Sequence, residues 1–188
     1  MNQIISGIIL AAGESKRFGK NKLLEKTPSG SPVGLASALK MEKCVDELYV
    51  VCAASSSTKC FFSDAGYNVV TTDPDRAGMG HSLKTGILAS SKSFAWIVAL
   101  ADMPFIPDSI YRRVAFSVRE GNKLVVPYYC GIHGHPVGFN HTFLKPIKSL
   151  TDSQTGAVLI KKYEQLIIKI HTDQRGVIWD VDYPSDLL

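Results

Sequence analysis

The sequence is poor in cysteine, and none of its cysteines stands in a metal-binding arrangement. Its four cysteines form no Cys-x-x-Cys pair and show no spacing typical of zinc ligands. This absence argues against a small zinc-stabilised module. We expect reduced and mostly buried thiols at Cys44, Cys52, Cys60 and Cys130.

Long apolar runs and long basic runs are absent as well. No apolar run reaches the ~18 residues of a membrane span, and Ile4–Leu10 is too short for a signal segment. The 21 basic and 17 acidic residues are spread along the chain and leave a net charge of +4, without a basic arm for nucleic acid. We therefore expect a cytoplasmic protein that binds neither membranes nor nucleic acid, and whose ligands are small anions.

What is present is an alternation of β-rich runs and segments of helical period, typical of an α/β fold with a mostly parallel sheet. With 188 residues, 45% of them hydrophobic, and no linker or repeat, the chain is predicted to be a single domain, residues 1–188. Strands are predicted at Ile4–Leu10, Leu48–Ala53, Asn68–Thr72, Ala95–Leu100, Lys123–Pro127, Leu166–His171 and Gly176–Val181. Helices are predicted at Val33–Lys43, Thr58–Ala65, Gly80–Ser90, Pro107–Arg119, His141–Leu150 and Gly156–Tyr163, and an extended excursion at Tyr128–Phe139.

The first strand leads into a loop of small and basic residues. Its sequence is Leu10-Ala11-Ala12-Gly13-Glu14-Ser15-Lys16-Arg17-Phe18-Gly19-Lys20-Asn21-Lys22. Small residues allow backbone N–H groups to approach phosphate oxygens, and Arg and Lys add charge-assisted hydrogen bonds. The loop is not a P-loop, because five residues separate Gly13 from Gly19 and Asn21 follows Lys20. It predicts an anion site at the carboxyl end of a strand, where open α/β sheets bind ligands.

Carboxylates follow two other predicted strands. Asp102 ends the strand Ala95–Leu100, and Asp180 and Asp182 belong to the last predicted strand and its end. Mg²⁺ is commonly held by one or two carboxylates together with substrate phosphates. The spacing of two would put Asp180 and Asp182 on one face of a strand. A helix cap or a turn is the alternative role for each of these aspartates.

Two glycine-rich segments are further candidates. Gly78-Met79-Gly80-His81-Ser82 leads into a helix and is suited to lie against a base or ribose, with helix capping by Ser82 as the alternative. His133 and His135 stand two apart in a glycine-rich ribbon. They lack a convincingly spaced third metal ligand, which favours a substrate-binding or structural role over a zinc site.

At these residues the chain resembles the molybdenum cofactor cytidylyltransferases, a branch of the MobA-like NTP transferases, over nearly its whole length. The resemblance rests on Leu10-Ala11-Ala12-Gly13-x-Ser15-x-Arg17-Phe18-Gly19-x-x-Lys22-Leu23-Leu24, on Asp102-Met103-Pro104 and on Asp180-Val181-Asp182-Tyr183-Pro184-x-Asp186-Leu187. The blocks at Gly78–Leu83 and Gly134–Val137 resemble the cytidylyl branch. One block departs from the family pattern: Ser153-Gln154-Thr155-Gly156-Ala157-Val158 stands where Gly-Asp-x-Gly-Ala-Arg is usual, and Asp152 lies two positions from the matching place.

The resemblance implies a three-layer α/β/α sandwich like that of the nucleotide-diphospho-sugar transferases. It implies transfer of CMP from CTP to molybdopterin, a Mg²⁺ cofactor, and a recipient molybdoenzyme or its chaperone as a further partner. The implied catalytic residues are Lys22, Arg17 and Asp102, and the implied metal ligands are Asp102, Asp180 and Asp182. The implied nucleotide-binding residues are Leu10, Ala11, Ala12, Gly13, Arg17, Lys22, Gly78, Ser82 and Asp102, with His135 and Pro136 at the acceptor. The alternatives are a guanylyl or sugar-phosphate nucleotidyltransferase, and a non-catalytic nucleotide sensor or cofactor chaperone.

Overall fold

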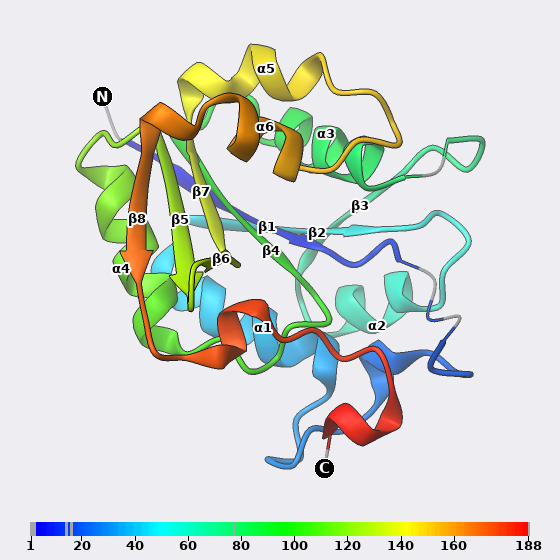
Figure 1. Ribbon diagram of the computed structural model, residues 1–188. Helices are drawn as coiled ribbons and strands as arrows, with labels where there is room; N and C mark the ends of the chain where they lie inside the picture. Colours follow the sequence, from blue (N-terminus) through cyan, green and yellow to red (C-terminus); the bar gives the residue numbers. More distant parts are fainter. Residues whose placement is uncertain (1–2, 14, 16, 77, 188) are drawn as a thin grey trace.

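The computed structural model describes residues 3–13, 15, 17–76 and 78–187, in which a sheet lies between two layers of helices (Figure 1). Glu14 and Lys16 of the predicted anion loop lie outside the described residues. The prediction of a three-layer α/β sandwich with a mostly parallel sheet is confirmed. Among the described residues, no helix combines the length and the apolar character that crossing a bilayer requires.

The sheet has β1 in its interior, in the order β3-β2-β1-β4-β7-β5-β6, with β8 paired to β5. β1 runs parallel to β2 and β4, β2 parallel to β3, and β5 parallel to β8. β7 pairs antiparallel with both β4 and β5, and β6 pairs antiparallel with β5. The strands are β1 (Ile5–Leu10), β2 (Glu47–Cys52), β3 (Asn68–Thr71), β4 (Ala95–Leu100), β5 (Leu124–Tyr129), β6 (Ile132–His133), β7 (Val137–Asn140) and β8 (Ile167–His171).

Helices cover both faces of this sheet. The α-helices are α1 (Val33–Met41), α2 (Thr58–Asp64), α3 (Met79–Ala89), α4 (Asp108–Arg119), α5 (Leu144–Lys148) and α6 (Ala157–Lys162). The 3-10 turns are η1 (Lys22–Leu24), η2 (Glu42–Cys44), η3 (His141–Phe143), η4 (Glu164–Leu166), η5 (Arg175–Ile178) and η6 (Pro184–Leu187). α3, α5 and α6 lie on one face and α1, α2 and α4 on the other (Figure 1).

The strands are apolar on both sides because each face of the sheet has its own core. Ile9 of β1 belongs to the cluster that includes residues of α1 and α4, whereas Ile8 belongs to the cluster under α3, α5 and α6. Successive side chains of a strand point to opposite faces, so this alternation follows directly from the β conformation. Continuous apolar strands of this kind are typical of parallel sheets covered on both faces.

A glycine brings α3 unusually close to the sheet. A Cβ atom added at Gly86 would lie 2.5 Å from Cγ2 of Ile8 and 2.9 Å from Cγ2 of Val51. Those distances are shorter than carbon–carbon contact allows. Glycine at this position therefore fixes how near the helix lies to β1 and β2.

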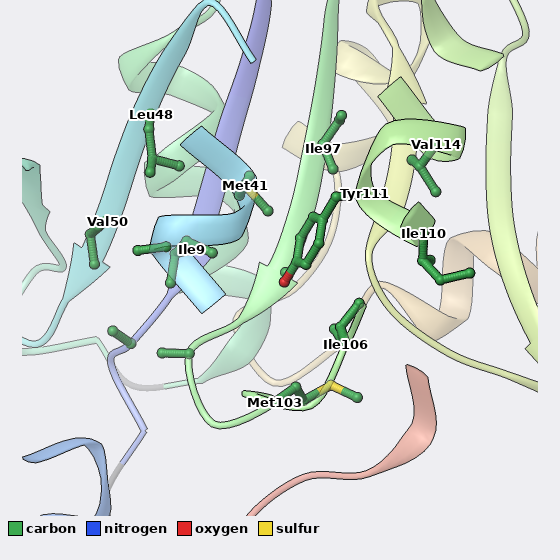
Figure 2. Packing of buried hydrophobic residues seen from close by; sticks show 14 of the residues in the cluster. Ile9, Met41, Leu48, Val50, Ile97, Met103, Ile106, Ile110, Tyr111 and Val114 are labelled. Atoms are coloured by element: carbon green, nitrogen blue, oxygen red, sulfur yellow. The ribbon is translucent and has the colours of Figure 1, made fainter. Parts of the chain in front are cut away.

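The loop that follows β4 is held from the core side. In Figure 2, Tyr111 of α4 lies beside β4, with Met103 and Ile106 of the loop near its hydroxyl end. Ser37 Oγ of α1 donates a hydrogen bond to the carbonyl of Met103 at 3.0 Å. Lys40 Nζ donates to the carbonyls of Pro104 at 2.7 Å and Ile106 at 2.9 Å. The position of Asp102 is thus set by α1 and α4 behind it.

The predicted strand at Gly176–Val181 is wrong. The segment contains the 3-10 turn η5 and then an extended stretch whose backbone bonds to loops instead of to a strand. The carbonyl of Val177 accepts from the amide of His135 at 2.8 Å, and the amide of Val181 donates to the carbonyl of Asp102 at 2.8 Å. Because these backbone groups bond to loops, the segment does not pair with a neighbouring strand.

The expectation of mostly buried thiols is also wrong. All four cysteines are free thiols, but Cys60 and Cys130 are exposed and Cys44 is only partly buried. Cys130 lies in the turn between β5 and β6, where its φ is 47°. Its side chain points out to solvent. Only Cys52, in β2, has the buried position that was expected.

Candidate active site

Four strand ends meet around one large cavity. β1, β2, β3 and β4 run parallel, so their carboxyl ends lie at the same edge of the sheet. The segments that follow them line a cavity of about 1020 Å³. The amide of Ala11 donates to the carbonyl of Val51 and that of Ala101 to the carbonyl of Leu10, which keeps these loops together as they leave the sheet. This edge is where open α/β sheets bind ligands.

The small-residue loop after β1 forms one wall of the cavity. Ala11, Ala12 and Gly13 line it, and Gly19 has a φ of 79° that favours glycine. Phe18 is buried and anchors the loop in the core, while the backbone amide of Lys22 donates to Ser15 Oγ at 3.2 Å. Asn21 Oδ1 accepts from the amide of Leu23 and so caps η1, which begins at Lys22. The loop is thereby folded back so that Lys22 lies at the cavity.

Lys22 lies between two carboxylates. Its Nζ is 2.8 Å from Oδ2 of Asp102 and 3.0 Å from Oδ1 of Asp182. The lysine side chain is only 12% exposed. Burial alone would lower the pKa of this ammonium, but Asp102 and then Asp182 outweigh burial, so the pKa of Lys22 is raised. Lys22 is therefore a fixed cation between the loop that follows β1 and the loop that follows β4.

Arg17 holds the far side of Asp182. Its NH1 donates to Oδ2 of Asp182 at 2.7 Å. The hydrogen bond from Lys22, opposed by burial and assisted by Arg17, lowers the pKa of Asp182 below its usual value. Asp186 Oδ2 accepts from the amides of Asp182 at 2.9 Å and Tyr183 at 2.6 Å, which fixes the turn that carries Asp182. In Figure 1 this last segment lies beside the loop after β1.

The predicted trio of metal ligands is only partly assembled. Asp102 and Asp182 converge on Lys22, but Asp180 is exposed and takes no part in that contact. Among the residues that the structure describes, no three acidic, histidine or cysteine side chains are grouped to hold a metal ion. Asp180 and Asp182 do not share the face of a strand, because the strand predicted to carry them is absent.

The start of α3 forms another wall of the cavity. Gly78, Met79 and Ser82 all line it. Gly78 has a φ of 129°, and a Cβ there would collide with the carbonyl oxygen of Asp152. Ser82 Oγ donates to the carbonyl of Gly78 at 3.2 Å, so this hydroxyl does not cap the helix by accepting from its amides.

The predicted acceptor residues lie apart from the cavity lining. Pro136 is buried and His135 is partly buried next to β4, with His135 Nδ1 3.5 Å from the carbonyl oxygen of Val98. Burial lowers the pKa of His135 to about 4, against the opposing effect of the Val98 carbonyl. His135 is therefore a neutral side chain at physiological pH. Its contact with an acceptor stays a prediction.

An ionic cluster at the cavity rim was missed from the sequence. Asp152 accepts from Nε and NH2 of Arg76, both at 2.7 Å, and from Lys84 Nζ, also at 2.7 Å. The hydrogen bonds from Arg76 and then Lys84 hold the pKa of Asp152 well below its usual range. Arg76 itself lines the cavity. The one sequence signal for this cluster was Asp152 itself, an acid that stands two positions from the aspartate of the family pattern.

Other cavity residues were missed as well, although their place in the sequence offered a signal. They follow β2 and β3, whose carboxyl ends lie at the same edge as that of β1. Apart from Asp73 and Pro74, their side chains are small or hydroxylated, so only their position marks them. These residues are Ala53, Ala54, Ser55, Ser56, Thr58, Thr72, Asp73 and Pro74.

The family model described as "MobA-like NTP transferase domain" matches residues 7–166. A protein of Halalkalibacterium halodurans named "Probable molybdenum cofactor guanylyltransferase" is 28% identical over 153 residues, which are 79% of this chain and 76% of that protein. A nicotine blue oxidoreductase of Paenarthrobacter nicotinovorans is 24% identical over 188 residues, 95% of this chain and 92% of that protein.

Solved structures have the same fold. The crystal structure of Rv0371c from Mycobacterium tuberculosis H37Rv superimposes with a TM-score of 0.81 at 24% identity, over 97% of this chain and 95% of that one. A complex of Rv0371c with manganese superimposes with a TM-score of 0.69 at 22% identity, over 90% of this chain and 88% of that one.

Proposed function

Because the chain belongs to the MobA-like NTP transferase domain family and is a nucleotidyltransferase, we propose that it transfers CMP from CTP to a molybdopterin acceptor. The products would be molybdopterin cytosine dinucleotide and pyrophosphate. One observation carries the proposal: Lys22 lies between Asp102 and Asp182 at a cavity walled by small residues and a glycine turn. The molybdopterin acceptor is supported by the guanylyltransferase relative, and CTP by the resemblance of Gly78–Leu83 and Gly134–Val137 to the cytidylyl branch.

The reaction needs charge neutralisation more than a base. A terminal phosphate oxygen of the acceptor attacks the α-phosphorus of CTP, a new P–O bond forms, and the bond to the β-phosphate breaks to release pyrophosphate. A phosphate monoester has a second pKa near ~6 and is already ionised at neutral pH. The protein's task in phosphoryl chemistry is positioning and electrostatic stabilisation.

Lys22 and Arg17 supply the positive charge. Lys22 is held in place by Asp102 and Asp182, so its ammonium is oriented before the triphosphate arrives. Charges fixed in advance stabilise the transition state without reorganisation during the reaction. Arg17, which is more exposed and bound to Asp182, can turn toward the phosphates at the cavity edge.

The same two carboxylates are suited to a divalent cation beside the Lys22 ammonium. Asp102 and Asp182 both lie within hydrogen-bond distance of one ammonium, so the structure already stabilises a cation between them. One or two carboxylates together with substrate phosphates are the usual ligands of Mg²⁺. Asp102 and Asp182 would hold the ion, which would neutralise charge on the phosphate oxygens. The manganese complex of Rv0371c, a protein of the same fold, supports a divalent ion as cofactor.

The deciding experiment supplies purified protein with Mg²⁺, molybdopterin and either CTP or GTP, and follows pyrophosphate release together with dinucleotide formation. We expect turnover with CTP. Turnover confined to GTP would assign the protein to the guanylyl branch instead. Nucleotide binding without pyrophosphate from either nucleotide would contradict nucleotidyl transfer to molybdopterin and favour a sensor or a different acceptor.

A further inference from the structure

The most unusual contact outside the proposed reaction centre joins two distant loops across the cavity rim. Asp152, in the segment between α5 and α6, meets Arg76 through two hydrogen bonds of 2.7 Å in a bidentate pair. Lys84 of α3 reaches the same carboxylate at 2.7 Å and the carbonyl of Leu150 at 2.8 Å. Bidentate pairs of arginine and carboxylate are both strong and geometrically specific.

The backbones of the two segments are in direct contact beneath this ionic cluster. The amide of Gly80 donates to the carbonyl of Asp152 at 3.1 Å. A Cβ atom at Gly78 would collide with the Asp152 carbonyl, and one at Gly80 with the carbonyls of Thr151 and Gln154. Only glycine allows so close an approach.

The segment of Asp152 is held by hydrogen bonds of its own. Gln154 Oε1 accepts from the amide of Thr151 at 2.8 Å, and the amide of Gln154 donates to the Thr151 carbonyl at 3.3 Å. Asp152 therefore has a fixed backbone and a carboxylate that is 29% exposed. An alternative role for Asp152 is to fill a phosphate site until the nucleotide binds. In that role the segment that carries Asp152 would have to move away when the phosphate arrives. The close glycine contacts argue against such movement.

His81 connects the same cluster to the next loop. Its Nε2 accepts from the amide of Asp73 at 3.1 Å, and its Nδ1 lies 3.9 Å from Oδ1 of Asp152. Arg76, His81 and Lys84 thus approach Asp152 from both sides of the glycine turn at Gly78. Of the residues they support, Asp73, Gly78 and Ser82 line the cavity, whereas Asp152 does not.

We propose that Asp152 is a positioning residue for nucleotide binding: it fixes the rim formed by residues 73–76 and 78–84 by holding Arg76 and Lys84. The inference rests on the proposed function, since it takes the cavity to be the nucleotide site. Asp152, the acid displaced from the place usual in the family, would thus act at the rim of the nucleotide site. Loss of that carboxylate would free the rim and misplace the residues that contact the nucleotide.

The test measures equilibrium binding of CTP and of GTP, each with Mg²⁺ and without acceptor, to wild type, Asp152→Asn, Arg76→Gln and the double variant. Small misplacements of binding groups have large effects, so we expect Asp152→Asn to raise Kd by about tenfold. Arg76→Gln should add little in the Asp152→Asn background, because the two residues act as one unit. Glu120→Gln, which removes one carboxylate charge at the exposed end of α4, serves as the matched control and should leave Kd unchanged.

Melting temperature separates positioning from general stability. A purely structural Asp152 would lower the melting temperature of Asp152→Asn and leave the Kd of the folded variant at the wild-type value, which would overturn the proposal. Tighter nucleotide binding by Asp152→Asn would also overturn it, because the carboxylate would then be competing with phosphate. If wild type binds nucleotide but forms no dinucleotide, the proposed function fails while the Kd comparison still decides the role of Asp152. If wild type binds neither nucleotide, both fail.

Discussion

At the scale of single residues, the proposed reaction centre depends on one lysine with two acidic partners. Lys22 is nearly buried, and both of its partners come from distant parts of the chain. Its ammonium therefore has two roles: it holds Asp102 and Asp182 together, and it is a fixed cation in the cavity lining. A substitution at Lys22 changes both the charge and the geometry of the two carboxylates.

Replacing Lys22 with alanine should lower kcat/KM by about 10²-fold or more, since removal of one preorganised charge contact has effects of that size. Pyrophosphate release under saturating and limiting CTP measures the change. Lys92→Ala, at an exposed position between α3 and β4, is the matched control and should behave as wild type. Near-normal turnover of Lys22→Ala would remove Lys22 from the mechanism.

Asp102→Asn keeps the shape of the side chain and removes its charge. We expect metal-dependent turnover to fall by roughly 10²-fold or more, because the divalent ion would lose one of its carboxylate ligands. The fold should persist, since the loop is held from behind by Ser37 and Lys40. Circular dichroism and a magnesium titration of the rate measure the two effects. Full magnesium-dependent activity in this variant would mean that the metal binds elsewhere.

His135 should make the stability of the protein depend on pH. Burial lowers its pKa to about 4 in the folded protein, whereas an unfolded histidine has a pKa near ~6.5. The unfolded chain therefore takes up a proton first as pH falls, and stability that is complete above the unfolded pKa is lost between about pH 6.5 and pH 4.

At pH 5 the loss is on the order of 2 kcal/mol for this group. Urea unfolding at pH 7 and pH 5 should show that His135→Gln loses less stability than wild type over this interval. His171→Gln, at an exposed position at the end of β8, should follow wild type. An equal loss in wild type and His135→Gln would show that His135 is not the group responsible.

At the scale of elements, the stability of the protein depends on the close contact between α3 and the sheet. Gly86→Val would force side-chain atoms into Ile8 and Val51, and overpacking of this kind destabilises by about 1 to 3 kcal/mol. Urea unfolding measures it. Leu88→Ala on the exposed face of α3 should change stability by no more than ~0.5 kcal/mol. Equal stability of Gly86→Val and wild type would mean that α3 can move away from the sheet.

The strands and helices with strong periodicity could be predicted from the sequence. The strand expected at Ala95–Leu100 has those bounds in the structure, and the helix expected from Pro107 begins at Asp108, with Pro107 at its cap. These segments bury apolar residues at the spacing that the element imposes, so local pattern and final burial agree. The segment Gly176–Val181 is also mostly apolar, but loops satisfy its backbone, and no local pattern reveals that.

The same difference between local and distant information explains which site residues could be predicted. The loop from Leu10 to Lys22 and the acid at Asp102 are marked by residue type directly after a strand. Asp182 was also predicted, although it reaches the site through the bond between Val181 and Asp102 and not through the face of a strand. The pair of Arg76 and Asp152 depends on contact between segments 76 residues apart. The displaced acid at position 152 is a sequence signal for the cluster, but it does not identify Arg76 as the partner.

At the scale of the whole molecule, the proposed reaction centre joins segments from both ends of the described chain. Asp182 contacts Arg17 and Lys22, which precede it by 165 and 160 positions. A variant ending after Val181 should remain folded, because Val181 is the last fully buried apolar residue of this segment. Its pyrophosphate release should fall as far as that of Asp182→Asn. Full activity of the shortened chain would exclude Asp182 from the centre.

The strand order also affects how the protein folds during translation. β1 lies in the interior of the sheet, and Ile5 pairs with Ala95 of β4, which is translated much later. At ribosomal rates of about 5 to 20 residues per second, β1 waits roughly 5 to 20 s for that neighbour. During this interval a nascent chain presents an apolar strand with one edge unpaired, which is a template for aggregation. Efficient production of the protein should therefore depend on chaperones that bind the first 90 or so residues while translation continues.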